Sequence, residues 1–239
     1  MIHDRAIDPA AFDAIAFDLD GTLIDTAPDI RHALNTALRE AGLPPCDLAS
    51  VQAWIGDGPD VLIARALAAH GAAGDADMRT RLRRGFDAAT LAAPLQFGSV
   101  YPGIGELLAG LRERVPMAVV TNKPTALARA VLDKAQLLAS LSMVFGADAA
   151  LHRKPAPHLL LATADRLGVA RHRLLMVGDS SADLLAAQAA GCPAVLALWG
   201  YGAHAVADGL ARWRIDTPDQ LAASLMLHPR RQPAAPLNA

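Results

Sequence analysis

Cysteine is scarce in this chain of 239 residues, where Cys46 and Cys192 are the only two. Two thiols are too few for a disulfide framework or for a thiolate metal site, and their scarcity suits a reducing compartment. We therefore expect two inert, partly buried thiols and a cytoplasmic protein.

The chain also lacks an excess of charge of one sign and a long apolar run. Its 22 basic and 24 acidic residues give a net charge of -2, which provides no field to attract polyanions. No stretch approaches the ~18 uninterrupted apolar residues of a membrane span, and residues 1–5 show no basic region leading into an apolar run. We expect a soluble, unprocessed protein without nucleic-acid or membrane partners; a monomer and a homodimer both remain open.

The residues that are present indicate a globular protein with a sizeable core. Hydrophobic residues make up 53% of the chain and charged residues 19%. The length corresponds to roughly 1.6 ordinary domains, which favours either one core with a large insertion or two domains.

Apolar segments alternate with helical segments after Tyr101-Pro102-Gly103, and this alternation is typical of a parallel sheet. An earlier apolar segment, 14–17, adds a further strand. The fold class predicted is therefore α/β, with a Rossmann-like parallel sheet. The expected strands are 14–17, 117–120, 143–145, 174–177 and 194–198, and the expected helices between them include 124–134, 157–167 and 182–190.

Residues 25–97 break this alternation, because their pattern is helical throughout. Thr26-Ala27-Pro28-Asp29 has the form of a capping box, and apolar residues follow it at helical spacing until Gly42. We expect an α/β core of residues 1–24 and 98–239, with 228–239 as a disordered tail. The inserted helices would form a cap over the carboxyl edge of the sheet, where ligands bind in open α/β sheets.

Two acidic residues follow the first strand, in the loop Asp18-Leu19-Asp20-Gly21-Thr22. Their spacing points the two side chains in different directions while both reach one pocket. Near Mg²⁺, Asp18 would stay ionised and attack phosphorus. Asp20 would donate a proton to the leaving oxygen and then take a proton from the attacking water.

The segment from Asp18 to Thr26 resembles the first motif of the haloacid dehalogenase superfamily of phosphatases. Val119-Val120-Thr121-Asn122-Lys123 resembles the second motif, which implies that the Thr121 hydroxyl and the N–H group of Asn122 bind a phosphate oxygen. Arg153-Lys154-Pro155-Ala156-Pro157 resembles the third motif. It implies that Lys154 places positive charge on the nucleophile and on the transferring phosphoryl group.

The segment from Val177 to Asp183 resembles the fourth motif. The resemblance implies that Mg²⁺ is held by Asp18, the backbone carbonyl of Asp20 and Asp179, an oxygen set that suits this ion. For Asp183, a metal role and an electrostatic role in the first turn of a helix both remain open. Backbone N–H groups around Gly21 and Thr22 would help to neutralise the transition state.

Within the superfamily, the chain is most similar to phosphatases of 2-phosphoglycolate. The resemblance lies in Trp54-Ile55-Gly56-Asp57-Gly58 and in the stretch beginning at Arg65. It implies hydrolysis of 2-phosphoglycolate to glycolate and phosphate through an aspartyl phosphate, with Gly56 and Arg65 near the substrate. Arg65 could equally face water, Gly56 could serve a turn, and a carboxylate at Asp57 could repel that of the substrate. N-acetylmuramate 6-phosphate as substrate, and a sugar phosphomutase of the same fold, remain alternatives.

The segment Trp199-Gly200-Tyr201-Gly202 follows the last expected strand. From the sequence, it either lines the edge of the site or packs against the core.

Overall fold

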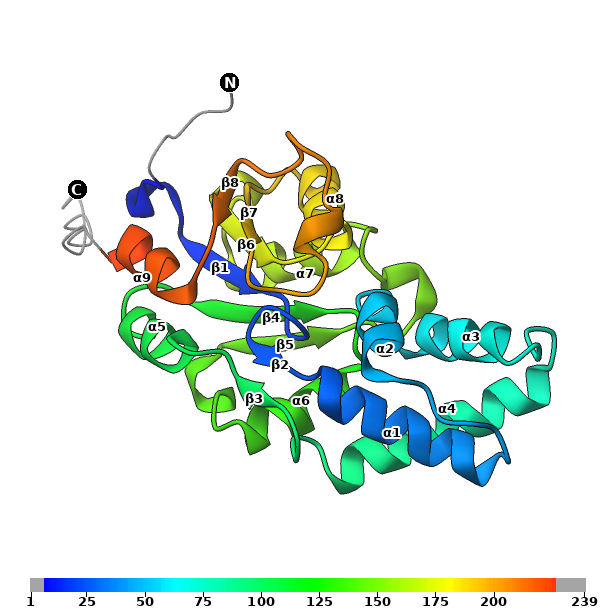
Figure 1. Ribbon diagram of the computed structural model, residues 1–239. Coiled ribbons are helices and arrows are strands. Elements are labelled where there is room, and N and C mark those ends of the chain that lie inside the picture. Colours follow the sequence, from blue (N-terminus) through cyan, green and yellow to red (C-terminus); the bar gives the residue numbers. More distant parts are fainter. Residues whose placement is uncertain (1–6, 227–239) are drawn as a thin grey trace, which may run out of the picture.

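Short apolar strands build a parallel sheet in the order β5-β4-β1-β6-β7-β8 in the computed structural model, which describes residues 7–226 (Figure 1). The expected tail, 228–239, lies outside the described residues. The strands are β1 (Ala14–Phe17), β4 (Met117–Thr121), β5 (Met143–Gly146), β6 (Leu174–Gly178), β7 (Ala194–Ala197) and β8 (Trp213–Ile215). All neighbouring strands of this sheet pair in parallel.

The two faces of the sheet are covered by different helices. Along β1, Ile15 and Phe17 join one hydrophobic cluster, whereas Ala14 and Ala16 join the other, as the alternation of a strand requires. The first cluster includes residues of α5 (Ile104–Leu111), α6 (Thr125–Lys134) and α9 (Pro218–Met226). The second includes residues of α7 (His158–Leu167) and α8 (Ser181–Ala190).

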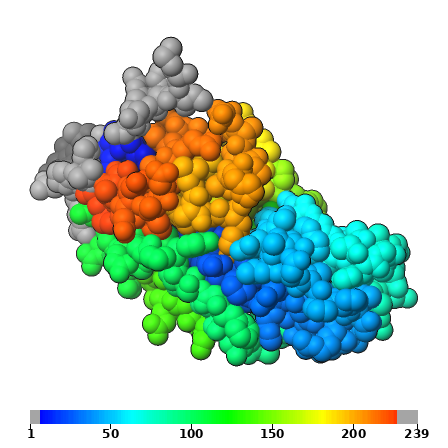
Figure 2. Space-filling model, in the orientation of Figure 1, coloured from blue at the N-terminus to red at the C-terminus, as the bar shows by residue number. Residues whose placement is uncertain are grey.

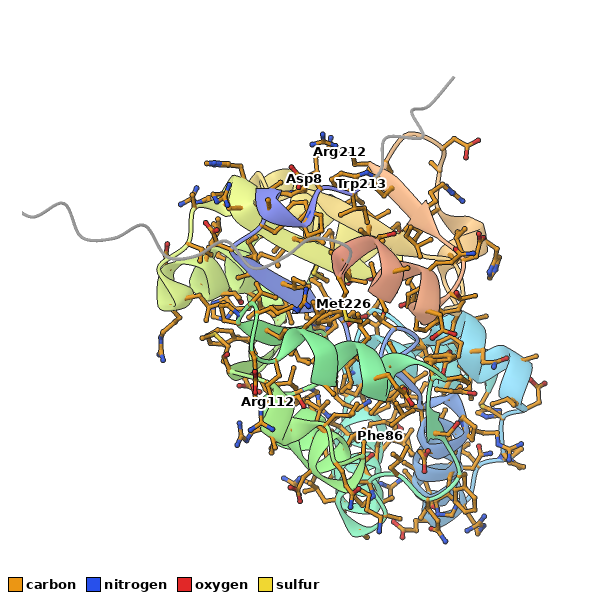
Figure 3. The ribbon with its side chains drawn as sticks, turned by 90° about the vertical axis from the view of Figure 1, so that its left-hand side faces the viewer. Asp8, Phe86, Arg112, Arg212, Trp213 and Met226 are labelled. Atoms are coloured by element: carbon orange, nitrogen blue, oxygen red, sulfur yellow. The ribbon has the colours of Figure 1, made fainter. Side chains whose placement is uncertain are left out.

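The β8 edge of the sheet is closed by aromatic contacts. The ring of Phe12 meets that of Trp213 edge-on with centroids 5.9 Å apart, and the guanidinium group of Arg212 lies 4.6 Å from the Trp213 ring. Figure 3 shows Arg212 and Trp213 side by side, and Met226 where α9 approaches α5. Short 3₁₀ turns lie at Pro9–Ala11, Leu138–Ser140, Ala150–His152, Arg171–Arg173 and Ala203–Ala205.

Four helices between β2 and β3 pack mainly on one another. They are α1 (Ala27–Glu40), α2 (Leu48–Trp54), α3 (Pro59–Ala69) and α4 (Ala76–Ala92), and they enclose a separate hydrophobic cluster that includes Leu34, Leu38, Ile63 and Leu67. Among the described residues, Leu127 of α6 is the only buried member of this cluster from outside these helices. In Figure 2 the helices form a blue-to-cyan lobe beside the rest of the described chain.

The chain passes into and out of this lobe through two strands, β2 (Ile24–Asp25) and β3 (Ser99–Val100), which pair antiparallel. The Asp29 carboxylate accepts hydrogen bonds from three successive backbone N–H groups, those of residues 96–98, at 2.6 to 3.0 Å. These contacts hold together the two crossings, which are the segments by which the chain enters and leaves the lobe.

The capping box predicted at residues 26–29 is wrong. Thr26 makes no side-chain hydrogen bond to its own helix, and its hydroxyl donates instead to Oδ1 of Asp20 at 2.6 Å. Asp29 is likewise engaged by residues 96–98 and not by the start of α1. Partners distant in the sequence have replaced the local hydrogen bonds.

Within residues 7–226, no helix has the length and apolar character that crossing a membrane requires.

Candidate active site

Polar side chains gather where the sheet order reverses. From β1 the chain continues to β4 and β5 on one side and then to β6, β7 and β8 on the other. Asp18 follows β1, Thr121 ends β4, and Asp179 follows β6, so their backbones meet at one edge of the sheet. Ligands of open α/β sheets bind at such a point.

Three buried carboxylates and one ammonium group form the centre of the site. Oxygens of Asp18, Asp179 and Asp183 lie within 4.8 Å of one another. The Lys154 Nζ lies 2.8 Å from Oδ1 of Asp18 and 2.6 Å from Oδ1 of Asp183, and it also donates to the carbonyl of Val120 at 2.8 Å. The structure therefore brings together residues that the motifs place up to 165 positions apart (183 minus 18).

This crowding changes the protonation of the acids. Burial and the neighbouring charge of Asp183 raise the pKa of Asp18 to about 8 and that of Asp179 to about 7. Burial opposes the charge on Lys154, but the carboxylates of Asp18 and Asp183 outweigh it and raise the pKa of Lys154. Lys154 is thus an ammonium ion that contacts two of the carboxylates. Its single positive charge does not compensate for the free-energy cost of burying three carboxylates.

The donor set fits a divalent cation. Three carboxylates and one ammonium group leave two negative charges in the ionised cluster, and carboxylate oxygens are the ligands that hard cations prefer. A bound cation would stabilise the ionised forms that burial disfavours. The cluster can therefore hold a metal, as expected from the sequence.

Asp179 is held by short contacts from several segments. Its Oδ1 accepts from the Thr22 hydroxyl at 2.9 Å, and its Oδ2 accepts from the Gly202 N–H at 3.1 Å. Gly21 has a φ of +87°, and a Cβ there would lie 2.6 Å from Oδ2 of Asp179. Only glycine fits this position, because the backbone must adopt a left-handed conformation and leave room for the acid.

Gly21 and Thr22 also close the turn after β1. The N–H of Gly21 donates to the carbonyl of Ile24 at 2.9 Å, and that of Thr22 donates to the carbonyl of Leu19 at 3.3 Å. The observed contacts of these two residues thus shape the loop and support Asp179. Their contact with a phosphate stays a prediction.

The helix-start role that the sequence allowed for Asp183 is present in the structure, and its metal role stays a prediction. Its Oδ2 accepts from the Ser180 N–H at 3.0 Å and from the Ser180 hydroxyl at 2.6 Å, which completes a capping box at the start of α8. Its Oδ1 faces Lys154 and lies in the acidic cluster. The cap fixes the side chain, so that the other oxygen faces the site.

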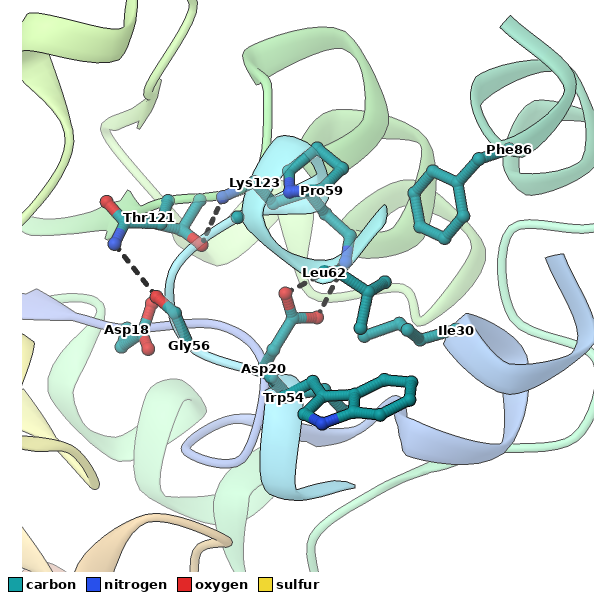
Figure 4. Close-up of a pocket in the computed structure, with 13 residues that line it drawn as sticks. Asp18, Asp20, Ile30, Trp54, Gly56, Pro59, Leu62, Phe86, Thr121 and Lys123 are labelled. Carbon is teal, nitrogen blue, oxygen red and sulfur yellow. Dashed lines mark hydrogen bonds and ion pairs between the residues drawn. The ribbon is translucent and has the colours of Figure 1, made fainter. Parts of the chain in front are cut away.

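Asp20 points away from this cluster, toward a cation that the sequence did not single out. The Lys123 Nζ lies 2.8 Å from both oxygens of Asp20 (Figure 4). The Thr26 hydroxyl also donates to one of these oxygens. Asp18 and Asp20 nevertheless line the same pocket. The expectation that the two acids take different directions into one pocket agrees with this geometry.

The Asn122 side chain links the edge of the sheet to Lys154 and to the loop after α2. Its side-chain nitrogen donates to the carbonyls of Gly56, at 2.8 Å, and of Lys154, at 3.0 Å, while its oxygen accepts from the Lys154 N–H at 2.7 Å. Next to it, the Thr121 hydroxyl accepts from the Lys123 N–H at 3.2 Å. The Asn122 side chain therefore fixes Lys154 and holds the loop after α2 against the sheet.

The pocket between the sheet edge and the cap helices has an empty volume of about 420 Å³. One wall is polar and carries Asp18, Asp20, Thr121, Asn122 and Lys123. The opposite wall comes from helices α1 to α4 and from the loop between α2 and α3, and it is mainly apolar (Figure 4): Ile30, Trp54, Ile55, Gly56, Gly58, Pro59, Leu62 and Phe86.

Arg65 lies outside this pocket lining. Its guanidinium group donates to Oδ2 of Asp57 at 2.6 Å and to the carbonyl of Trp54 at 3.0 Å. The pair neutralises Asp57 and braces the loop that carries Gly56. In this structure the contacts of Arg65 are with the loop, and a direct contact with substrate stays a prediction.

The segment after β7 takes both of the positions that the sequence left open, because Trp199 packs against the hydrophobic core while the Gly202 N–H donates to Asp179 at the edge of the site. The indole N–H of Trp199 donates to the carbonyl of Thr22 at 2.9 Å, and the Tyr201 hydroxyl accepts from the Ala27 N–H at 3.0 Å and donates to Asp25. Neither Tyr201 nor Lys123 could be selected from the sequence, because a lone tyrosine or lysine after a strand is usually a surface residue.

Comparison with known proteins is consistent with this geometry. The family model described as haloacid dehalogenase-like hydrolase matches residues 15–197, and the chain belongs to this family. A phosphoglycolate phosphatase of Rhodospirillum rubrum is 44% identical over 200 residues, which cover 81% of this chain and 83% of the relative. A phosphoglycolate phosphatase of Yersinia pseudotuberculosis is 38% identical over 192 residues, covering 80% and 83%.

A solved structure from Haemophilus somnus, described as a predicted phosphoglycolate phosphatase, has the same fold. It superposes with a TM-score of 0.82 at 30% identity, covering 91% of this chain and 98% of that chain. The α/β fold class and the family resemblance predicted from the sequence are confirmed.

Proposed function

We propose that this hydrolase is a Mg²⁺-dependent phosphatase that converts 2-phosphoglycolate to glycolate and phosphate through an aspartyl phosphate at Asp18. The observation that carries the proposal is the pairing of Asp18 with Lys154 inside a buried acidic cluster, with Asp20 on the wall of the same pocket. The names of the relatives support the choice of substrate.

Asp18 is the nucleophile in this mechanism. Its position at the end of β1 lets a carboxylate oxygen approach a phosphorus atom held at the carboxyl edge of the sheet. Lys154, Thr121 and the N–H of Asn122 would bind the oxygens of the phosphoryl group, where negative charge collects in the transition state. The bond from phosphorus to the ester oxygen breaks as the bond to Asp18 forms.

Asp20 is the acid and then the base. In the first step it donates a proton to the ester oxygen, which leaves as the hydroxyl of glycolate. In the second step it takes a proton from the water that attacks the aspartyl phosphate, and Asp18 is restored. Lys123 and Thr26 fix the orientation of Asp20 toward the pocket.

Asp18, Asp179 and the backbone carbonyl of Asp20 would hold Mg²⁺, with Asp183 as a ligand or as a support for the others. When bound, the ion neutralises the phosphoryl oxygens and keeps the Asp18 carboxylate ionised. Asp179 is oriented for this role by Thr22 and Gly202.

Residues 25–97 act as a cap that excludes water. The division into a core of residues 1–24 and 98–239 and this cap is supported by the separate hydrophobic cluster of α1 to α4 and by the paired crossings at β2 and β3. Closure places the apolar residues of the cap over the polar wall of the pocket.

A panel of phosphate monoesters tests the proposal. With Mg²⁺, kcat/KM for 2-phosphoglycolate should exceed that for sugar 6-phosphates, including N-acetylmuramate 6-phosphate, by at least about 10-fold, since the relatives are named phosphoglycolate phosphatases. Chelation of the metal should abolish turnover. A higher kcat/KM for a sugar phosphate, or isomerised sugar phosphate without free phosphate, would contradict the proposed substrate.

A further inference from the structure

Lys123 is a buried cation that the mechanism uses only to orient Asp20. Its side chain is 6% exposed and that of Asp20 is 13% exposed, so both charges are largely removed from water. Lys123 is also the only cationic side chain among the described residues that line the pocket. A lysine in this position therefore presents a charge to whatever occupies the pocket.

The other cations near the cap are already engaged elsewhere. Arg65 contacts Asp57 and the carbonyl of Trp54, outside the pocket lining. Arg153 also lies outside this lining, where its guanidinium group contacts the Asp57 carbonyl at 3.4 Å and the Asp60 carboxylate at 3.6 Å. Neither arginine lines the pocket that contains Asp20.

From this arrangement we infer that Lys123 determines substrate preference by binding the carboxylate of the leaving group; this inference rests on the proposed hydrolysis of 2-phosphoglycolate. A single methylene group separates that carboxylate from the ester oxygen. Asp20 must contact the ester oxygen to protonate it, so the substrate carboxylate lies close to Asp20 and within reach of the ammonium group beside it.

The charge count explains why a cation is needed here. Once Asp20 has donated its proton, its carboxylate stands beside the carboxylate of glycolate, and two carboxylates side by side in a buried pocket repel each other strongly. An ammonium group has three N–H donors, and the contacts with Asp20 use at most two of them. The third donor can bind the substrate carboxylate while Asp20 stays in place.

The inference differs from a role in which Lys123 only positions Asp20. A positioning residue affects every phosphate ester alike, because each needs the same proton. A residue that binds the carboxylate affects 2-phosphoglycolate more than an ester without that group. Ethyl phosphate is a suited comparison, since a methyl group stands where the carboxylate is.

The experiment measures kcat/KM for both esters in the wild-type enzyme and in Lys123→Met, Lys123→Arg and Lys134→Met. We expect the ratio of 2-phosphoglycolate to ethyl phosphate to fall by on the order of 10- to 100-fold in Lys123→Met, the loss typical of a hydrogen bond between charged groups. Lys123→Arg should restore part of the ratio. Lys134→Met, the matched control, removes an exposed lysine at the end of α6 and should leave the ratio unchanged. Thermal melting checks that each variant is folded.

A second readout avoids turnover. In an Asp18→Asn background, the affinity for 2-phosphoglycolate measured by calorimetry should fall with Lys123→Met, while that for ethyl phosphate should change little. Equal losses for the two esters would overturn the inference and leave Lys123 as a positioning residue. If the wild-type enzyme itself does not prefer 2-phosphoglycolate, the proposed substrate fails first, and the inference fails with it.

Discussion

At the scale of single residues, the site depends on acids that are costly to ionise in the positions where they are needed. Burial and the charge of Asp183 raise the pKa of both Asp18 and Asp179, so the metal-free site retains protons near neutral pH. A nucleophilic carboxylate must be ionised, and a cation bound in the cluster would favour the ionised form of Asp18 despite its burial. The same crowding therefore links catalysis, metal binding and stability.

This linkage predicts how the thermal stability depends on pH. The folded Asp18 has a pKa of about 8 against an ordinary 3.8, so the stability it contributes is present below the unfolded value and is lost as the pH rises through about 8. Mg²⁺ binds the ionised form, so the rise in Tm on adding Mg²⁺ should be larger at pH 8.5 than at pH 5.5. Differential scanning fluorimetry with Mg²⁺ or chelator measures this rise.

Asp179→Asn is the control for that measurement. It removes one proposed ligand and should reduce the Mg²⁺-induced rise in Tm at pH 8.5. A rise of equal size at both pH values in the wild-type protein would contradict the linkage.

At the scale of elements, the central strands could be predicted from the sequence and the crossings could not. Strands such as 14–17 and 174–178 are continuous apolar runs, and the motif acids directly follow them, so both the edge of the sheet and Asp18 and Asp179 could be located. β2, β3 and β8 are two or three residues long, too short for a pattern, and each exists only because a distant segment pairs with it. Asp29 likewise accepts hydrogen bonds from residues 96–98 and does not form the capping box that the sequence predicted at the start of α1.

The three hydrogen bonds of Asp29 give a prediction about the crossings. Asp29→Ala would leave the N–H groups of residues 96–98 without this buried acceptor, and we expect the free energy of unfolding to fall by about 3 kcal/mol. Asp75→Ala, a control, removes an exposed carboxylate that accepts from the Met78 N–H at the start of α4, and it should cost about 1 kcal/mol. Urea unfolding measures both. Equal losses would show that the crossings do not depend on Asp29.

At the scale of the whole molecule, the two parts contribute opposite surfaces to one pocket. The sheet supplies charge, and the cap helices supply apolar side chains together with a loop that Asn122 holds against the sheet. The motifs located Asp18, Asp20, Thr121 and Lys154, because each stands in or beside a recognisable sequence pattern. They did not reveal Lys123 or Tyr201, because the partners that give these residues a role, Asp20 and Asp25, come from another part of the chain.

The central claim is that the phosphoryl group passes through Asp18, and acid quenching of the enzyme during turnover of 2-phosphoglycolate tests it most directly. Mass spectrometry of the digested protein should find a phosphoryl group on the peptide containing Asp18. Asp18→Asn should lose this adduct and at least about 10³-fold in phosphate release, while its melting curve remains cooperative. Turnover of Asp18→Asn at a near-normal rate, or a phosphoryl group on a different residue, would contradict the account.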